Sequence, residues 1–278
     1  MTRPVTITGD PEPDQQPHRW DDHVVFYEDV FEPLTQRFAL AAIEALSLKP
    51  RSRVLDSGAG TGGAALELAR RGHRVTAIDA SLAMARRATA RAAAAALRVE
   101  VLTMDGQNLS LPDGSFDAAL SVLGVILFPD AVRGLSELRR TVKRGGRIAL
   151  VTWTAPEAYE LVGELRAAAV SVLGSLPSRP LPAQLRFKDK ENFQALFAAA
   201  GFPAPEIAEV AGELVAPSPA WLAERLAFAP GMAALLEGFG AARAEVVTAF
   251  RKRLEARGSG RVALLARAYV GTITVAHE

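Results

Sequence analysis

The sequence predicts an α/β fold with a doubly wound, mostly parallel sheet. Short apolar segments typical of buried strands alternate with longer segments whose apolar residues recur at helical spacing. A glycine-rich turn, residues 58–63, joins the first predicted strand to the helix that follows it. Parallel strands joined by right-handed helical crossovers place the residues that follow each strand along one edge of the sheet, and we expect the ligand site there.

Composition and charge exclude several classes of protein. A chain of 278 residues with 49% hydrophobic residues is long enough to bury one large core. The formal net charge of +1 disfavours partners that bind through bulk charge. Because the chain has no cysteine, it has no disulfide, thiolate metal site or cysteine nucleophile. It also lacks a signal-peptide pattern and an apolar run long enough to cross a membrane, so we expect a cytoplasmic protein that does not bind membranes.

The N-terminal region divides into two parts. Residues 1–19 are rich in proline, aspartate and glutamine, and we expect a disordered tail because this segment has little apolar surface to bury. Residues 20–50 show helical spacing interrupted at Pro33, which predicts two helical pieces that form an N-terminal lid.

Residues 51–155 are predicted to form the core of the fold. Three helices are expected within it, at about 61–71, 81–96 and 129–142. Gly58, Asp79, Asp105 and Ser121 all lie at or just after the ends of predicted strands, and therefore at the expected ligand edge. The strands are predicted at residues 53–56, 75–78, 99–102, 116–122 and 147–153.

The rest of the chain continues the α/β pattern after an interruption. Residues 156–188 contain a helical segment at 157–173 and a stretch with three prolines, which together indicate an inserted cap. Residues 189–278 are predicted to complete the same α/β domain. The expected elements are helices at 190–200, 219–228 and 232–256, a strand at 206–215, and a last strand within 265–275.

The stretch VLDSGAGTGG, residues 54–63, fits two nucleotide-binding patterns. Gly58, Gly60 and Gly63 match the G-x-G-x-x-G of nicotinamide and flavin dinucleotide sites. Asp56 with Gly58, Gly60 and Gly62 matches the acidic-x-G-x-G-x-G pattern of S-adenosylmethionine sites. In both, the missing side chains let a ligand approach the backbone at a helix N-terminus, and Asp79 is placed to accept both ribose hydroxyls of either cofactor.

Further features favour the methionine cofactor. A carboxylate at Asp56 would repel a dinucleotide diphosphate, whereas it would attract the ammonium group of a methionine moiety. Asp105 follows the third strand, where it is able to accept a hydrogen bond from an adenine amino group, although Asp105-Gly106 is also a common turn sequence. A third feature is an ordered series of landmarks, FDAALS at 116–121, FPD at 128–130 and KRGGR at 143–147.

With these motifs the chain resembles the class I S-adenosylmethionine-dependent methyltransferases. Within that group it is most similar to the small-molecule branch related to the ubiquinone/menaquinone-biosynthesis methyltransferases. The resemblance is close over residues 20–153 and loose beyond them. It implies a Rossmann-like fold with a seven-stranded sheet, whose antiparallel last strand would come from residues 268–275, and S-adenosyl-L-methionine as the cofactor.

The resemblance also implies a set of cofactor-binding residues. By analogy, the glycine-rich turn surrounds the methionine portion, the end of the second strand binds the ribose, and the segment after the third strand faces the adenine. The lid covers the methionine end, and the residues after the fourth strand lie beneath the donor methyl group. These residues are Trp20, Tyr27, Asp56, Gly58, Ala59, Gly60, Gly62, Asp79, Ala80, Met84, Asp105, Gly106, Gln107, Ser121 and Leu123.

His23 is the candidate catalytic residue. A sulfonium donor already carries its leaving group, so positioning matters more than acid–base chemistry unless the acceptor is a hydroxyl or an acidic carbon. His23 lies in the predicted lid with Trp20 and Tyr27 and is the histidine best placed to act as a base. The alternative is that these side chains pack and hydrogen-bond within the lid itself. The polar lead-in around Asp21 and Asp22 is interpreted as a solvated face, so no metal is expected.

The predicted acceptor is a small molecule. Arg86, Arg87 and Arg91 form a basic strip without interleaved aromatic residues, so nucleic acid is a poor candidate. Apolar residues at 123–128 and in the cap (Leu176, Leu181, Leu185 and Phe187) predict an apolar pocket under a lid. We therefore expect methyl transfer to oxygen or carbon of a largely apolar polyketide, quinone or terpenoid intermediate, by a monomer or a homodimer. Two alternatives are a protein that keeps the cofactor structurally while it catalyses a cyclisation, and a nicotinamide-dependent oxidoreductase.

Overall fold

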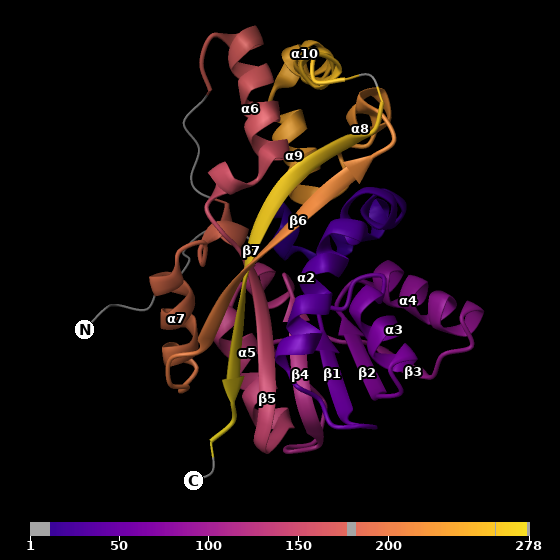
Figure 1. The fold of residues 1–278 in the computed structure, drawn as a ribbon, viewed down its shortest axis with the longest axis vertical. Helices are drawn as coiled ribbons and strands as arrows, with labels where there is room; N and C mark the ends of the chain where they lie inside the picture. The colour runs from indigo at the N-terminus through magenta and orange to yellow at the C-terminus, as the bar shows by residue number, and fades with distance from the viewer. Residues whose placement is uncertain (1–11, 177–181, 259, 277–278) are drawn as a thin grey trace.

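A seven-stranded sheet lies at the centre of the molecule (Figure 1). The computed structural model describes residues 12–176, 182–258 and 260–276. Strands β1 to β5 are all parallel to one another, and β7 is antiparallel to both β5 and β6. The predicted mostly parallel sheet with an antiparallel last strand is therefore confirmed. The strands are β1 (Arg53–Ser57), β2 (Arg74–Asp79), β3 (Val99–Thr103), β4 (Phe116–Val122), β5 (Val142–Trp153), β6 (Glu206–Ala216) and β7 (Val262–Thr274), in the spatial order β3-β2-β1-β4-β5-β7-β6.

Both faces of the parallel part of the sheet are buried, which explains the continuous apolar runs in its strands. Successive residues point to opposite faces, so Val54 packs in one apolar cluster and Leu55 in the other. The same alternation separates Ala118 from Ala119 on β4. A sheet that is covered on both faces needs helices on each side, as the strand–helix alternation predicted.

Helices cover the two faces of the sheet in separate groups (Figure 1). α2 (Glu32–Ala45) and α3 (Gly63–Arg70) supply residues to the cluster on one face. α5 (Ala131–Thr141) and α7 (Lys190–Ala199) supply residues to the other. α4 (Leu82–Ala94) packs against β2 and β3, and Ser81 caps its N-terminus by accepting the Met84 N–H.

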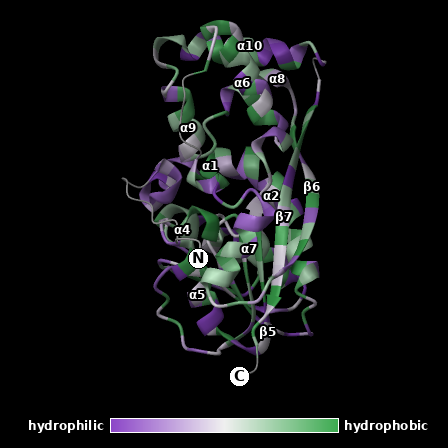
Figure 2. Cartoon of the chain, turned by 90° about the vertical axis from the view of Figure 1, so that its left-hand side faces the viewer, coloured by the Kyte–Doolittle hydropathy of each residue, from purple (hydrophilic) through white to green (hydrophobic). Residues whose placement is uncertain are grey.

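The cap is built from two separate parts of the chain, not from the single predicted segment 156–188. α6 (Glu160–Leu173) packs against α10 (Arg243–Glu255), which also contacts α8 (Pro219–Glu224). Figure 2 shows these helices and α9 (Pro230–Glu237) stacked at the end of the molecule where β6 and β7 extend beyond the other strands. The predicted helix at 232–256 is split into α9 and α10 because the chain turns at Gly240, which has φ +55°.

The ordered chain begins earlier than expected. Residues 1–11 of the predicted tail lie outside the described residues, but Pro13–Gln15 and Pro17–His23 form 3₁₀-helical turns that pack against the rest of the protein. α1 (Val24–Phe26) follows, then a π-helical turn at Tyr27–Phe31, which leads into α2. Pro33 lies in the first turn of α2, where the missing N–H has no cost, so it does not end a helix there.

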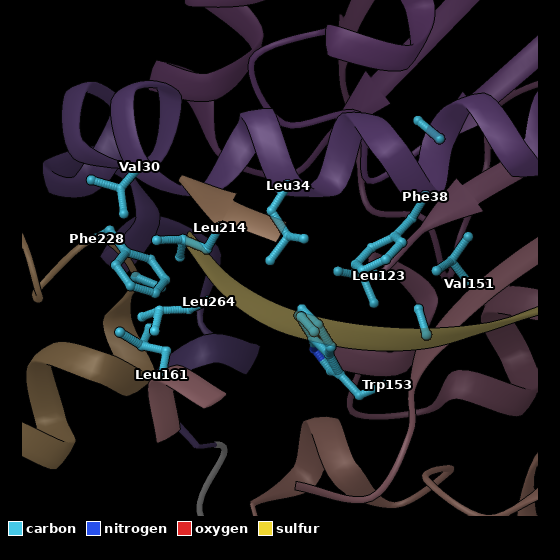
Figure 3. Packing of buried hydrophobic residues seen from close by; sticks show 14 of the residues in the cluster. Val30, Leu34, Phe38, Leu123, Val151, Trp153, Leu161, Leu214, Phe228 and Leu264 are labelled. Atoms are coloured by element: carbon cyan, nitrogen blue, oxygen red, sulfur yellow. The ribbon is translucent and has the colours of Figure 1, made fainter. Parts of the chain in front are cut away.

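The cap and the core share one apolar cluster (Figure 3). Leu34 and Phe38 on α2 pack near Trp153 at the end of β5, while Leu161 of α6 and Phe228 join the same cluster from the cap. Because cap and core bury their apolar surface against each other, the space between them has fixed walls. In the described ranges, every helix is too short or too polar to cross a lipid bilayer.

Candidate functional site

One cavity of about 1200 Å³ lies between the carboxyl ends of the parallel strands and the cap. This volume exceeds the ~300–1,000 Å³ usual for a single small-molecule site. Its core side, residues 58–129, contributes Gly58, Gly60, Asp79, Ala80, Met84, Met104, Asp105, Gly106, Gln107, Val122, Leu123, Gly124, Leu127, Phe128 and Pro129. Its cap side is contributed by residues within 12–17, 153–166, 182–185 and 228–239, together with Leu176 and Arg267. Trp20, Tyr27, Phe31 and Thr35 also line the cavity.

The glycine-rich turn adopts a backbone that only glycine accepts easily. Gly58 and Gly60 have φ of +72° and +55° and line the cavity. A Cβ at Gly58 would lie 2.9 Å from Gly124 Cα, so the turn also packs closely against the loop after β4. Gly62 and Ala59 do not line the cavity, because Gly62 packs against Ala88 of α4 and the Ala59 N–H is bonded to the Ile78 carbonyl.

Asp79 holds the glycine-rich turn from the end of β2. Its Oδ2 accepts the Gly60 N–H at 2.7 Å, and its Oδ1 accepts the Ser81 N–H at 2.8 Å. Burial raises the pKa of its carboxyl to about 6, although the two backbone hydrogen bonds act in the opposite direction and lower the pKa. Asp79 lines the cavity and is therefore placed to accept hydrogen bonds from a ligand.

Asp56, which the sequence predicts to surround the methionine portion of the cofactor, is buried and is not among the residues that line the cavity. Its side chain is only 1% exposed, and its Oδ2 has no hydrogen-bond partner among the described residues. Burial and the nearby charge of Asp79 raise the pKa of Asp56 to about 7. The two carboxyls therefore form a buried acidic pair whose charges a cationic ligand would stabilise.

The segment after β3 forms another part of the core side. Asp105 Oδ1 accepts both the backbone N–H of Gln107, at 2.9 Å, and its side-chain amide, at 3.0 Å. A Cβ at Gly106 would lie 2.5 Å from the Phe128 ring, so only glycine fits beside this aromatic wall. Ala80 and Met84 line the same part of the cavity.

The loop after β4 is held at both ends. Ser121 is 1% exposed and is not among the residues that line the cavity, so its contact with the cofactor stays a prediction. Its hydroxyl instead donates to the Ser57 carbonyl at 2.6 Å and accepts the Val125 N–H at 2.9 Å. From the cap, Arg186 Nη2 donates to the carbonyls of Ile126 and Phe128 at 2.9 and 2.8 Å. Leu123, with φ +59°, lines the cavity within this loop.

The lid brings Trp20 and Tyr27 to the cavity but not His23. A Cβ at Gly60 would lie 3.4 Å from the Tyr27 hydroxyl, so Tyr27 lies directly over the glycine-rich turn. His23 Nδ1 is hydrogen-bonded to the Ala227 carbonyl at 2.8 Å, and the residue is not part of the cavity wall. This contact fits the alternative that His23 hydrogen-bonds within the lid and cap, and the assignment of His23 as the base stays a prediction.

The cap side is mostly apolar and aromatic. Trp153 stacks on Tyr159 with ring centroids 5.2 Å apart, and Phe31 stacks on Phe228 at 4.9 Å. Leu176 and Leu185 line the cavity as expected, Phe187 does not, and Leu181 lies outside the described residues. Such rings provide rigid apolar surface for a ligand.

Residues 12–17 form a strap across the cap side, although this segment was expected to belong to a disordered tail. Glu12 Oε2 accepts the Ala183 N–H at 2.8 Å, and Asp14 Oδ1 accepts the Gly231 N–H at 2.7 Å. The indole N–H of Trp20 donates to the Asp14 carbonyl at 3.0 Å. A polar, proline-rich segment carries no local signal for these contacts, because its partners lie far along the chain.

Comparison with known proteins identifies the class that this fold and site define. Residues 54–146 match the family model described as a methyltransferase domain. The demethylmenaquinone methyltransferase of Thermus thermophilus is 34% identical over 178 residues, which cover 60% of this chain and 81% of that protein. The chain therefore belongs to the class I S-adenosylmethionine-dependent methyltransferases, and the nicotinamide interpretation of the glycine-rich turn is set aside.

The chain is also similar to a further relative and to two solved structures. An uncharacterized protein of Mycobacterium tuberculosis is 36% identical over 138 residues. The match covers 50% of this chain and 48% of that protein, so the chain spans about half the length of this relative. The cyclase SpnF has a TM-score of 0.56 at 22% identity and covers 92% of this chain and 96% of its own. A Haemonchus contortus N-methyltransferase solved with S-adenosylhomocysteine has a TM-score of 0.57 at 20% identity. The superposition covers 91% of this chain and 57% of that protein.

The residues present fit the family's cofactor, S-adenosylmethionine. Gly58 and Gly60 leave the space that side chains would fill, and Asp79 lines the same wall. The buried acidic pair of Asp56 and Asp79 has no cationic side chain bonded to it among the described residues, so a ligand that carries an ammonium and a sulfonium would complement it.

Proposed function

We propose that this protein catalyses S-adenosylmethionine-dependent methyl transfer to oxygen or carbon of a small, largely apolar metabolite, such as a polyketide, quinone or terpenoid intermediate. The observation that carries this proposal is the single cavity that joins the glycine-rich turn to the aromatic cap side. Its volume of about 1200 Å³ provides room for cofactor and acceptor together. The similarity to demethylmenaquinone methyltransferase, a protein named for a quinone acceptor, supports an apolar acceptor.

The core side supplies the groups that would hold the cofactor. Gly58 and Gly60 would face the methionine portion, Asp79 the ribose hydroxyls, and the segment 105–107 the adenine. Ala80 and Met84 would pack against it, Leu123 would lie near the donor methyl group, and Trp20 and Tyr27 would cover it. Asp56 would act from behind the turn through its charge, while Ala59, Gly62 and Ser121 would shape the backbone.

The chain's own contribution to the reaction would be positioning and exclusion of water. When bound, the cofactor supplies a methyl group on a sulfonium, which needs no acid to activate it. The rigid ring pairs of the cap side would hold the acceptor in line with that group. The lid residues Trp20 and Tyr27 would close the cavity over the reacting atoms and keep water out.

Incubation of the purified protein with methyl-labelled S-adenosylmethionine tests the proposal. Candidate phenols, quinols and other apolar metabolites would serve as acceptors, and product mass would be measured. We expect an acceptor that gains one CH₂ unit. Cofactor binding without transfer to any small molecule would count against the proposal, and a rearranged product of unchanged mass would favour a cyclisation instead.

A further inference from the structure

A carboxylate in the strap reaches the cap side with one oxygen free. Asp14 lines the cavity, and its Oδ1 is held by the Gly231 N–H at 2.7 Å. Its backbone is fixed by the Trp20 indole N–H, which donates to the Asp14 carbonyl. A Cβ at Gly231 would clash with Oδ2, so this oxygen lies against the Gly231 backbone, and it has no hydrogen-bond partner among the described residues.

The charges around Asp14 leave it without a neutralising partner. Glu12, on the same strap, is bonded to the Ala183 N–H, and Arg267 of β7 is paired with Glu209. Arg166 of α6 also lines the cavity, yet the described residues show no ion pair between it and Asp14. Burial is the main reason why the pKa of Asp14 is raised to about 6. The hydrogen bond from Gly231 lowers this pKa, and the nearby charge of Glu12 raises it slightly. A carboxylate in this range is ionised at neutral pH and is a stronger base than an exposed aspartate.

We propose that Asp14 is the general base of the reaction and that the acceptor is therefore a hydroxyl compound. This inference rests on the proposed methyl transfer. The acceptor hydroxyl donates to Oδ2, and its O–H bond breaks as its oxygen gains the methyl group. The proton passes to Asp14, and the electron pair of the broken carbon–sulfur bond stays on sulfur, so charge and atoms balance. Asp14 thereby takes the role that the sequence suggested for His23.

A pair of probes that differ only in the hydroxyl hydrogen tests this assignment without turnover. The affinities of 2-naphthol and its methyl ether, 2-methoxynaphthalene, would be measured by titration calorimetry on the full chain loaded with S-adenosylhomocysteine. In Asp14→Asn, the amide oxygen still accepts the Gly231 N–H, but the carboxylate is lost. We expect the preference for 2-naphthol over the ether to fall about tenfold, because a hydrogen bond to a charged group is worth about 1.5–3 kcal/mol.

Two controls separate Asp14 from its surroundings. Affinity for S-adenosylhomocysteine should be the same in Asp14→Asn as in the wild type, because Asp14 lies away from the core side. Glu12→Gln changes the other carboxylate of the strap and should retain the preference for 2-naphthol. Loss of that preference in Glu12→Gln, with retention in Asp14→Asn, would overturn the proposal.

The wild-type protein provides a second test that does not depend on the folding of a variant. Between about pH 7.5 and about pH 5, the preference for 2-naphthol should fall as Asp14 gains a proton, with a midpoint near its pKa of about 6, while affinity for the ether stays constant. A preference that changes neither with pH nor in Asp14→Asn would overturn the assignment of the base. Failure of the wild type to bind S-adenosylhomocysteine would instead contradict the proposed function.

Discussion

The two sides of the cavity are built in different ways. The core side comes from turns that directly follow β1, β2, β3 and β4, so each of its residues is placed by the strand before it. The cap side combines the strap with residues within 153–176, 182–185 and 228–239, which meet only after the whole chain has folded. Its strap contacts join residues 171 and 217 positions apart. Backbone geometry and buried charge dominate the core side, whereas aromatic packing dominates the cap side.

This difference indicates how each side responds to substitution. On the core side, polar atoms hold the backbone in an unusual shape, and removal of one such atom should release the turn. On the cap side, several buried polar groups have no partner in the described residues or carry an unfavourable charge, and their removal should leave the fold intact or make it more stable.

The largest effect is expected for Asp79→Ala on the core side. The substitution removes the acceptor of the Gly60 and Ser81 N–H groups and releases the glycine-rich turn. We expect affinity for S-adenosylhomocysteine to fall about 100-fold, which corresponds to about 2.7 kcal/mol, as measured by titration calorimetry.

Asp117→Ala is the matched control for that measurement. Asp117 also accepts a backbone N–H, from Arg53 at 2.8 Å, but it lies outside the cavity. Its loss should cost stability without changing affinity for S-adenosylhomocysteine. Equal losses of affinity in the two variants would show that the core side is not held by Asp79 in particular.

A pH-dependent effect is expected for Asp14→Asn on the cap side. The folded-state pKa of Asp14 is raised from 3.8 to about 6, so the folded protein binds this proton more tightly than the unfolded chain does. The contribution of Asp14 to the free energy of unfolding of the wild type is therefore lost as pH rises from about 4 to about 6. The variant should be more stable than the wild type by about 2 kcal/mol at pH 8 and by little at pH 4, as measured by urea unfolding. A difference that is independent of pH would contradict the burial of a charged Asp14.

The smallest effect is expected for Tyr159→Phe. The Tyr159 hydroxyl is buried without a partner among the described residues, and burial raises its pKa. Its loss should raise the free energy of unfolding by about 1 kcal/mol, because no hydrogen bond is broken and the stacking on Trp153 is kept. Tyr269→Phe, outside the cavity, provides the comparison and should change stability less. A clear destabilisation by Tyr159→Phe would show that the hydroxyl has a stabilising partner.

Most of the core side was predictable from the sequence because its signals are local. Gly58 and Gly60 mark positive φ angles, and Asp79 directly follows a strand that pairs in parallel with β1. The sequence did not indicate which strand residues would be fully buried. Asp56 and Ser121 are each 1% exposed and are not among the residues that line the cavity, so their contact with the cofactor stays a prediction.

The strap on the cap side was beyond sequence reasoning for a physical reason. A polar segment such as residues 12–17 has no periodicity of its own, and its order depends on backbone N–H groups at Ala183 and Gly231 that it meets only in the folded chain. His23 shows the same limit, because its side chain could have turned toward the cavity until the Ala227 carbonyl supplied a partner.

The sequence by itself therefore determined the parallel sheet, its glycine-rich turn and the class of cofactor, since each depends on side-chain patterns within a few residues. Only the tertiary structure decided which carboxylates line the cavity, how the cap is assembled and where His23 lies. Those outcomes depend on contacts between segments far apart in the chain, and local propensity carries no information about such contacts.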